Sequence, residues 1–443
     1  MSERPDRLSP FACDRATESR PRRQIADTPA APVAGRSWLC LMERLSRGML
    51  RGTMRNLQLG QIVLEQGADS ERFGDLSAVA LAGHVKVLSP KFYRRILTDG
   101  VLGAAESYLE GEWISDELTD VFRVLLKNEH VIAKFSSSLT WISNLRHRLH
   151  HFRNRNSRAG SRRNIHEHYD LGNSFFSLFL DPTMMYSSAI FPDEQASLQE
   201  GSMEKVDRAC RQLQLQPTDD LIEIGTGWGT LAIHAASQYG CRVTTTTISD
   251  EQFRMATQRV ADAGLSDRVT VLKRDYRDLT GQFDKLVSIE MIEAVGRRYL
   301  PGYFQKCSEL LKDDGAMLIQ AIVLPEQRYA GYEESVDFIQ KYIFPGGFLP
   351  SVSMMQQFVT EKTPLRLLAL DDFGLHYART LRLWNERFHE QLDAVRALGF
   401  DERFIRMWRY YLCYCEAAFL ERAIGLVQVL WAKPASPLGN AWH

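Results

Sequence analysis

Residues 219–229 read DDLIEIGTGWG, and this stretch decides the fold. An apolar segment, Leu221 to Ile224, runs directly into a turn that carries three glycines, and a helix-like segment from Leu231 to Ala236 follows. A strand, a glycine-rich turn and a helix in this order form the layout of a nucleotide-type cofactor site. Such a turn is a weak signal alone, because similar turns serve only to reverse the chain. The surrounding sequence must therefore decide.

The sequence after this turn alternates between strand-like and helix-like segments. Strands are predicted over residues 241–248, 269–272, 283–288 and 315–322, and helices over 250–263 and 298–311. This alternation predicts an α/β protein with a doubly wound, mainly parallel sheet. Ligands bind at the carboxyl ends of the strands in such sheets. We therefore expect the glycine turn, Thr247-Ile248, Asp275-Tyr276 and Glu290 to Glu293 to gather at one edge.

The details of the turn narrow the choice of cofactor. The G-x-G-x-x-G spacing is absent, and the second strand ends in Thr245-Thr246-Thr247 instead of an acidic ribose ligand, which argues against a dinucleotide. The Walker lysine and its serine or threonine are also missing, which argues against a nucleoside triphosphate. S-adenosylmethionine is the better candidate.

Composition bounds the class of protein. The chain has 443 residues, of which 44% are hydrophobic and 25% charged, as expected for a soluble globular protein of two domains. The net charge of −1 gives no general attraction for nucleic acid. Seven cysteines without C-x-x-C spacing predict a reduced cytoplasmic protein and no metal site. No apolar stretch has membrane-spanning length, and no signal peptide is evident.

The chain is expected to divide into five segments. Residues 1–36 are rich in Pro, Arg, Ser and Ala and predict a disordered tail. Residues 37–140 predict a small α+β accessory domain, associated with lipid or membrane, and residues 164–433 the catalytic domain, with a tail at 434–443. Residues 141–163 form a basic linker. Three readings of this linker stay open: a solvated connection, a contact with anionic phospholipid headgroups, and nucleic-acid binding.

Four further motifs carry a family resemblance: IHEHYDLGN at 165–173, MYSS at 185–188, DYRD at 275–278 and KYIFPGG at 341–347. In this order they resemble the cyclopropane-fatty-acyl-phospholipid synthases and their relatives that modify mycolic acids. The resemblance covers roughly residues 60–432 and is strongest from residue 164 onward. It implies that a one-carbon unit moves from S-adenosylmethionine to the double bond of an unsaturated acyl chain on a membrane phospholipid.

The resemblance also assigns residues to the cofactor. These are Tyr186, Ser187, Gly225, Thr226, Gly227, Thr247, Ile248, Gln252 and Tyr276. Backbone N–H groups of the glycine turn would approach the methionine carboxylate, as helix N-termini do for other anions. Tyr276 would lie against the adenine. The alternative for Tyr186 and Tyr276 is that they are half-buried packing residues.

In the family, a bicarbonate ion held by a cysteine, a glutamate, a histidine, a tyrosine and a backbone group acts as the base. The matching positions here carry Ser188, Glu293, Gln320 and Tyr377. The hydroxyl of Ser188 and the amide of Gln320 could still hold an anion. Alternatively, a buried Glu293 with fewer donors would have a raised pKa and could itself serve as the base.

The base decides the product. After methyl transfer, proton loss from the added methyl group gives a cyclopropane, and loss from a neighbouring chain carbon gives a methyl-branched or methylene product. We expect cyclopropane formation first and C-methylation second, by a cytoplasmic enzyme bound peripherally to the membrane. The resemblance also suggests a homodimer.

Other functions are less consistent with the sequence. A small-molecule C-methyltransferase would not need the basic linker, a nucleic-acid methyltransferase would need a basic face, and a non-catalytic lipid-binding protein would not need Glu293 with the cofactor turn. Aromatic residues within 338–349 and 408–419 predict core, and some could line an acyl tunnel.

Overall fold

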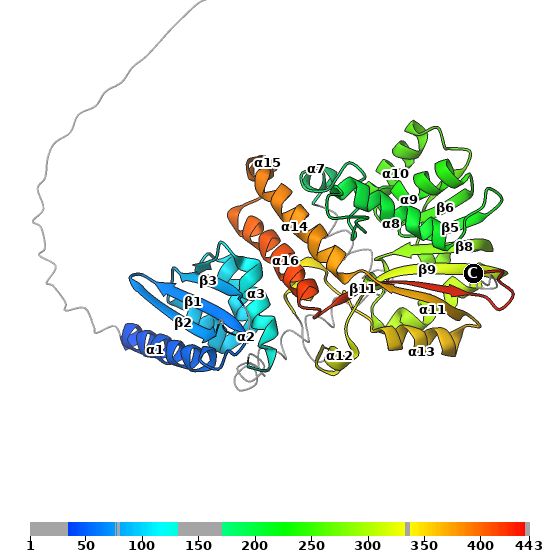
Figure 1. Cartoon of the computed structure of the whole chain (residues 1–443). Coiled ribbons are helices and arrows are strands. Elements are labelled where there is room, and N and C mark those ends of the chain that lie inside the picture. The colour runs from blue at the N-terminus through cyan, green and yellow to red at the C-terminus, as the bar shows by residue number, and fades with distance from the viewer. Residues whose placement is uncertain (1–33, 76, 78–79, 132–170, 333–336, 439–443) are drawn as a thin grey trace, which may run out of the picture. The chain divides into compact units, whose positions relative to one another are not determined.

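The computed structural model describes residues 34–75, 77, 80–131, 171–332 and 337–438 (Figure 1). The basic linker, most of the first family motif and most of the N-terminal tail lie outside these residues. Residues 34–36, which the sequence assigned to the disordered tail, begin helix α1 (Ala34–Met54). The residues from Met42 onward belong to one compact unit, which is described below.

A seven-stranded sheet organises the catalytic part of the chain. Its strands are β5 (Asp220–Ile224), β6 (Arg242–Thr247), β7 (Val269–Lys273), β8 (Phe283–Ile289), β9 (Leu311–Val323), β10 (Arg366–Asp372) and β11 (Gly425–Ala432). Their order in the sheet is β10-β11-β9-β8-β5-β6-β7. Strands β5 to β9 pair in parallel, which confirms the predicted doubly wound, mainly parallel sheet.

Helices cover both faces of this sheet (Figure 1). They are α8 (Leu198–Gln212), α9 (Thr230–His234), α10 (Asp250–Asp262), α11 (Leu300–Glu309) and α13 (Val352–Lys362). Successive strand residues point to opposite faces. Leu221 accordingly joins the core under α8 and α9, while Ile222 and Ile224 join the core under α11 and α13.

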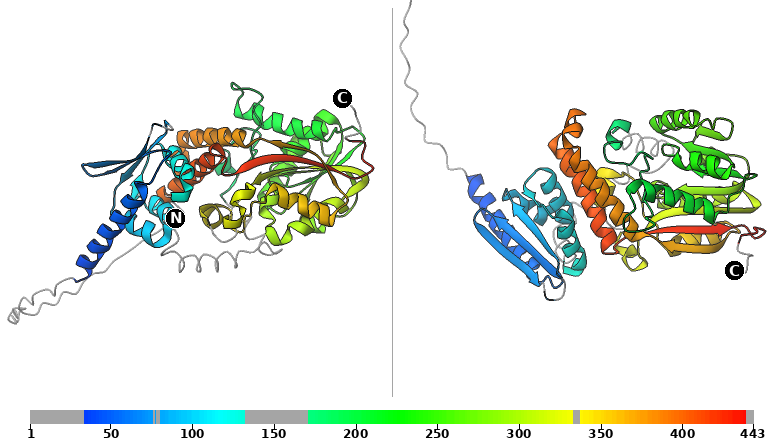
Figure 2. Two further views of the ribbon diagram at one scale, coloured as in Figure 1. Left: turned by 60° about the horizontal axis from the view of Figure 1, so that its bottom comes forward. Right: turned by 45° about the horizontal axis from the view of Figure 1, so that its top comes forward.

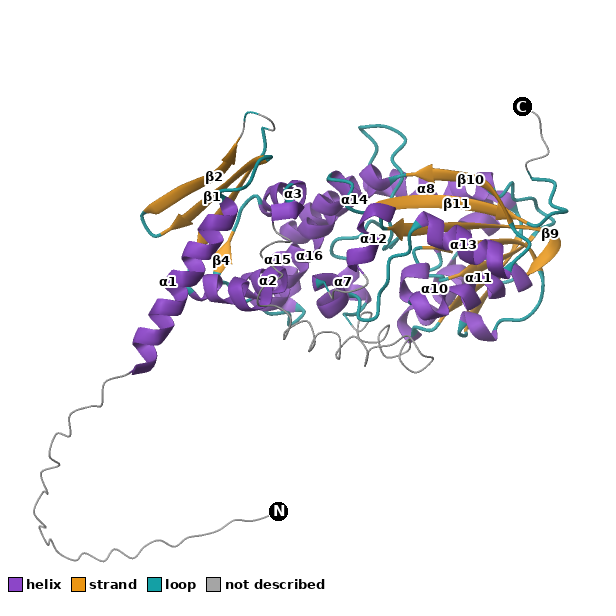
Figure 3. Cartoon of the chain, turned by 90° about the horizontal axis from the view of Figure 1, so that it is seen from below, coloured by secondary structure: helices purple, strands orange, loops and turns teal. Residues whose placement is uncertain are grey.

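Three sequence-based boundaries or topologies need correction. Strand β9 begins at Leu311 instead of residue 315, and the preceding helix ends at Glu309 after beginning at Leu300. The polar run from Lys312 to Asp314 hides the start of the strand, although Leu311 already pairs with Phe283. Strands β10 and β11 were not predicted. Strand β11 pairs antiparallel with β9, and β10 pairs antiparallel with β11 (Figure 3).

A second, four-stranded sheet belongs to the predicted α+β accessory region. Its strands are β1 (Gly60–Gln66), β2 (Asp69–Asp75), β3 (Ala82–Val87) and β4 (Trp113–Ile114), in the order β2-β1-β3-β4. Helices α2 (Lys91–Leu109) and α3 (Leu118–Lys127) accompany it. Helix α3 buries Leu118, Val121, Phe122 and Val124, an amphipathic spacing that explains why it forms against an apolar core.

Helices α14 (Gly374–Glu390) and α16 (Glu402–Leu420) lie side by side, with the short α15 (Leu392–Ala397) between them in sequence (Figure 2). They share an aromatic core with α7 (Asn173–Phe176). Trp384 and Trp408 are fully buried in it, with Phe175 and Phe388. The core role predicted for the C-terminal aromatic residues is therefore confirmed for Trp408 and its buried neighbours. Helix α12 (Glu326–Tyr332) and a π-helical turn (Ile339–Ile343) follow β9 in the chain.

Candidate active site

A cavity of about 760 Å³ lies at the carboxyl ends of the parallel strands. One wall consists of the glycine turn after β5 and the residues that follow β6, β7 and β8, as the sequence predicted. Much of the remaining lining is apolar and aromatic. It includes Phe344, Phe348, Leu349, Tyr411, Phe419 and Ile424. The cavity therefore has both polar and apolar lining.

All nine residues expected to contact the cofactor line this cavity. The hydroxyl of Thr247 donates to Gln252 Oε1 at 2.8 Å, which fixes the side chain that follows β6. The guanidinium of Arg277 lies 5.6 Å from the ring centroid of Tyr276 and covers it. Tyr186 donates to the hydroxyl of Tyr411 at 3.0 Å. Their arrangement fits a cofactor, although each individual contact stays a prediction.

The glycine turn departs in one respect from the expected anion site. The amides of Gly225 and Thr226 both donate to the carbonyl of Thr246, at 3.1 and 3.0 Å. These two amides are thus already engaged, so their contact with a methionine carboxylate stays a prediction. The Thr226 hydroxyl is buried without a hydrogen-bond partner among the described residues. It is a further candidate donor that sequence reasoning did not identify.

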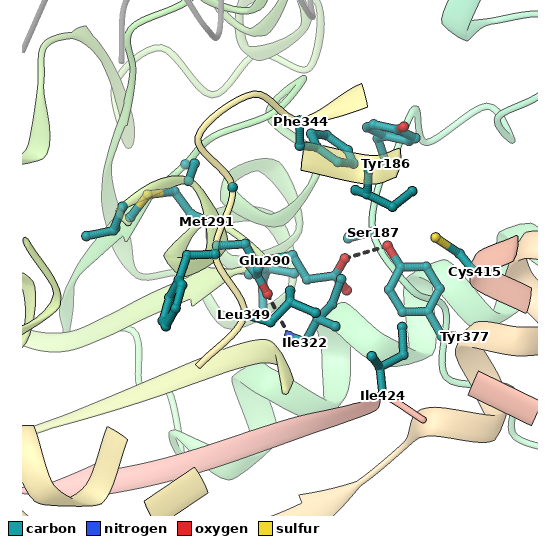
Figure 4. A pocket seen from close by; sticks show the side chains of 18 of the residues that line it. Tyr186, Ser187, Glu290, Met291, Ile322, Phe344, Leu349, Tyr377, Cys415 and Ile424 are labelled. Carbon is teal, nitrogen blue, oxygen red and sulfur yellow. Dashed lines mark hydrogen bonds between the residues drawn. The ribbon is translucent and has the colours of Figure 1, made fainter. Parts of the chain in front are cut away.

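The centre of the site is Glu290, to which the sequence analysis gave no individual role. Its Oε1 accepts hydrogen bonds from the backbone amide of Ser188 at 2.9 Å and from Gln320 Nε2 at 2.7 Å. Its Oε2 accepts from the hydroxyl of Tyr377 at 2.7 Å (Figure 4). Burial raises the pKa of Glu290, while nearby Lys205 and these donors oppose the rise. Three elements therefore converge on one buried carboxylate.

The donors around Glu290 are themselves held in place. Gln428 on β11 donates to Gln320 Oε1 at 2.9 Å, so the Gln320 amide presents Nε2 to Glu290. Tyr377 stacks on Phe419 with 4.6 Å between ring centroids. The expected role of the Ser188 hydroxyl needs correction, because this hydroxyl donates to the carbonyl of Ala189 at 2.9 Å. Ser188 contributes its backbone amide instead.

Glu293 lies apart from this donor set. Its Oε1 accepts the amide of Ile322 at 2.6 Å, and its Oε2 is buried without a partner among the described residues. Burial, followed by repulsion from Glu290, raises the pKa of Glu293 to about 8. The raised pKa was predicted, and it makes Glu293 predominantly neutral near pH 7. Its role as the base stays a prediction, and Glu290 competes for that role.

This raised pKa predicts a pH dependence of stability. Folded protein keeps the Glu293 proton up to about pH 8, whereas the unfolded chain releases it near 4.5, so this group loses its stabilising contribution as pH rises between these values. We expect the Glu293→Gln variant to lose less melting temperature than the wild type across this range. Thermal unfolding followed by circular dichroism measures the difference. Equal slopes for the two proteins would contradict the assignment.

A buried lysine lies beneath the site. Lys205 on α8 is 0% exposed, and its Nζ donates to the hydroxyl of Ser187 at 2.5 Å. Burial lowers the pKa of Lys205 to about 8, and the carboxylates of Glu290, Asp181 and Glu223 oppose the shift. The sequence carries a signal for this residue, because its spacing from Leu198, Ser202 and Ala209 places it on the buried face of the helix.

Bicarbonate does not fit the described site. The side chains of Gln320 and Tyr377, which the resemblance assigns to that anion, both donate to Glu290. Ser188 turns its amide to the same carboxylate, and Glu293 pairs with Ile322. The carboxylate of Glu290 thus uses the donors that an anion would need. No step of the reaction is therefore derived through bicarbonate.

The sheet order, the glycine turn and the cavity at the strand ends together define a class I, Rossmann-like methyltransferase. Residues 156–429 match the family model for mycolic acid cyclopropane synthetase. A tuberculostearic acid methyltransferase of Mycobacterium tuberculosis is 40% identical over 420 residues, which cover 93% of this chain and 95% of that protein. The cyclopropane-fatty-acyl-phospholipid synthase of Escherichia coli K12 is 37% identical over 361 residues, with coverages of 79% and 87%.

A solved structure agrees with these matches. The structure of a mycolic acid cyclopropane synthase complexed with SAH and CTAB has a TM-score of 0.58 at 31% identity, and it covers 61% of this chain and 98% of that one. The chain belongs to the mycolic acid cyclopropane synthetase family. It is an S-adenosylmethionine-dependent methyltransferase.

Proposed function

We propose that this enzyme methylates the double bond of an unsaturated phospholipid acyl chain and that the product keeps one double bond as a methylene branch. One observation carries the proposal. A single cavity brings together the glycine turn, the buried carboxylate of Glu290 and an apolar lining. The class of substrate, an unsaturated lipid chain, agrees with the names of two relatives, the tuberculostearic acid methyltransferase and the cyclopropane-fatty-acyl-phospholipid synthase.

The apolar lining suits both the substrate and the chemistry. An acyl chain gains free energy when its surface leaves water, at about 25 cal/mol per Å². A carbocation formed on that chain would react with water, so the reacting carbons must be kept dry. Phe344, Leu349 and Phe419 line the cavity near Tyr377, which donates to Glu290. The same lining would therefore bind the chain and exclude water.

The reaction balances with groups of this chain and its co-substrate. S-adenosylmethionine supplies an electrophilic methyl group when bound. The π electrons of the alkene form the new carbon–carbon bond, and the electrons of the broken carbon–sulfur bond remain on sulfur. A hydride of the methylated carbon then shifts with its electrons to the neighbouring cationic carbon, and a base of the protein takes a proton from the added methyl group. The electrons of that carbon–hydrogen bond become the methylene double bond.

Cyclopropane formation, the first expectation from the sequence, is the second candidate. It differs in that no hydride shifts, because loss of a proton from the added methyl group while the cation is on the neighbouring chain carbon closes a ring. One finding favours the methylene product. The match to a tuberculostearic acid methyltransferase extends over 93% of the chain. Phospholipid as the lipid class is supported by the name of the Escherichia coli relative.

The proposal predicts a labelled lipid. Expression in a bacterial host that lacks cyclopropane fatty acids, fed with labelled methionine, should add one labelled CH2 unit per modified chain while unsaturation is retained. Gas chromatography with mass spectrometry of fatty acid methyl esters measures both. A saturated ring product would instead establish cyclopropane formation. Absence of labelled lipid with intact cofactor binding and suitable host substrates would favour a small-molecule substrate.

The Gly225→Val variant is the control for this experiment. Gly225 has φ +100°, and a Cβ at this position would lie 3.2 Å from Met291 Cγ. The variant should therefore distort the glycine turn and lose labelled product while the host lipids remain the same. Product formed at the wild-type rate would show that this turn is not part of the working site.

Peripheral membrane association is a further part of the proposal. Among the described residues, no helix is both long and apolar enough to cross a bilayer. On α1, Leu45 and Met49 are 54% and 45% exposed, and they lie one helical turn apart. Arg44 is exposed on the same helix, and Arg55 is exposed in the turn directly after it. Exposed apolar residues beside arginine suit the interface of an anionic bilayer.

Substitution of the exposed apolar residues of α1 should weaken lipid binding. The double variant Leu45→Glu with Met49→Glu should bind vesicles of phosphatidylglycerol about tenfold more weakly, because it removes apolar contacts and adds negative charge. Vesicle sedimentation measures the change. Leu375→Glu is the matched control, since Leu375 on α14 is 51% exposed. Equal binding by all three proteins would rule out α1 as the membrane contact.

A further inference from the structure

We infer that Glu290 is the catalytic base of this enzyme and that its carboxylate takes the place of a free bicarbonate ion. The inference rests on the proposed function, because a base is required only if a lipid double bond is alkylated. It assigns a catalytic residue beyond the four that the resemblance implies. It also predicts that turnover needs no external anion.

The geometry of Glu290 supports this assignment. Its Oε1 accepts two hydrogen bonds, from Ser188 and Gln320, whereas its Oε2 accepts one, from Tyr377. A carboxylate oxygen has two lone pairs, so Oε2 retains the capacity to take a proton. Glu290 also lines the cavity (Figure 4), as the glycine turn does. The oxygen that can accept a proton thus belongs to the wall where methyl transfer would occur.

The backbone holds Glu290 in an unusual conformation that aims its side chain. Its φ is +48°, in the left-handed region that non-glycine residues rarely adopt. Its amide donates to the carbonyl of Gln320 at 2.9 Å, so the same residue of β9 binds both the backbone and the side chain of Glu290. Such conformations persist where the surrounding structure fixes them, often at functional sites.

Charged and titratable groups on neighbouring elements act on the ionisation of Glu290. Lys205 on α8 supplies a positive charge, and Glu293 in the next turn opposes ionisation of the pair. Tyr377 on α14 and Tyr411 on α16 have pKa values raised by burial and stay neutral. Burial raises the pKa of Glu290 above that of an exposed glutamate, which strengthens it as a proton acceptor.

Glu293 is the competing base, and its surroundings differ. One of its oxygens is engaged by the amide of Ile322, and no side chain donates to it among the described residues. Its pKa of about 8 leaves it mostly protonated at pH 7, whereas a general base must be unprotonated to accept a proton. Two neighbouring carboxyl groups in different environments commonly take different roles. Glu290 is the carboxyl group whose negative charge three hydrogen-bond donors would stabilise.

The decisive variant is Glu290→Gln, tested for labelled lipid formation with the purified full-length protein, phospholipid vesicles and labelled S-adenosylmethionine. It preserves size and removes the base, so the rate should fall at least about 100-fold. Glu293→Gln is the matched control and should lose less than tenfold. Binding of S-adenosylhomocysteine, measured by calorimetry, should stay within threefold for both variants and shows that each is folded.

A second variant tests the replacement of bicarbonate. Glu290→Gly opens the space between Ser188, Gln320 and Tyr377, and the positive φ suits glycine. Added sodium bicarbonate should raise its rate at least tenfold, without effect on Glu290→Gln. Carbon NMR should show labelled bicarbonate bound to Glu290→Gly and not to the wild type. The wild-type rate should be the same in buffer purged of carbon dioxide.

The outcomes separate this inference from the proposed function. Absence of labelled lipid from the wild type would overturn the function itself. Wild-type product together with a nearly unchanged Glu290→Gln rate would overturn only the inference. A wild-type rate that falls on purging and returns with sodium bicarbonate would overturn it as well, even if the variants fail to fold.

Discussion

Replacing Lys205 with methionine is expected to move the acid limb of the pH profile of kcat/KM upward by about one pH unit, so that the rate falls on that limb and approaches the wild-type rate above it. Lys205 is 0% exposed and is a principal attractive charge on Glu290. Without it the pKa of Glu290 rises further, so the carboxylate becomes protonated at higher pH. Raising the pH should therefore restore part of the lost rate.

Two comparisons separate the charge of Lys205 from its hydrogen bond. Lys205→Gln keeps a donor that can reach Ser187 but removes the charge, so it should shift the profile as methionine does. Lys312→Met removes a half-exposed lysine paired with Asp284 and should leave the profile unchanged. If Lys205→Gln behaves as the wild type, the hydrogen bond and not the charge explains the effect.

Replacing Trp384 with alanine should destabilise the folded protein by about 3–5 kcal/mol, the usual cost of deleting a fully buried tryptophan. Trp384 is 0% exposed and contacts Tyr186 and Tyr377 at ring-centroid distances of 5.3 and 6.1 Å. Its indole N–H has no acceptor among the described residues, so the substitution breaks no hydrogen bond of this group there. The cost is therefore that of the cavity.

Urea unfolding followed by tryptophan fluorescence and circular dichroism measures this loss. Trp384→Phe should recover more than half of it, because the phenyl ring fills part of the space and leaves no unpaired N–H. Leu398→Ala, at a position 46% exposed, should change stability by less than about 0.5 kcal/mol. A loss below about 1 kcal/mol for Trp384→Ala would show that the helices collapse into the cavity.

The sequence predicted the parallel half of the sheet because helices follow β5, β6 and β8, so the apolar pattern changes period at these boundaries. Strands β10 and β11 lack this signal. They pair antiparallel to each other and reach β9 from positions far along the chain. Such long-range pairing depends on packing that a local pattern does not record.

The place of the site was predictable, while the identity of its central residue was not. The rule for parallel sheets located the cavity, and all nine expected cofactor residues line it. The choice between Glu290 and Glu293 depends on the turn after β8, where Glu290 has φ +48° and residues Ile292–Ala294 form a 3-10 turn. The family resemblance assigned a role to Glu293, whereas the hydrogen-bond donors of Ser188, Gln320 and Tyr377 bind Glu290, at the start of that turn.

Gln428, which orients the side chain that binds Glu290, is synthesised after the rest of the site. It orients Gln320 from strand β11, which inserts between β9 and β10 although both precede it in sequence. A ribosome therefore makes the glycine turn and both glutamates before the strand that orients the amide facing Glu290. A nascent chain that has not yet folded β11 into the sheet would hold its cofactor turn without a finished base. Alkylating activity would then begin only after the sheet is closed.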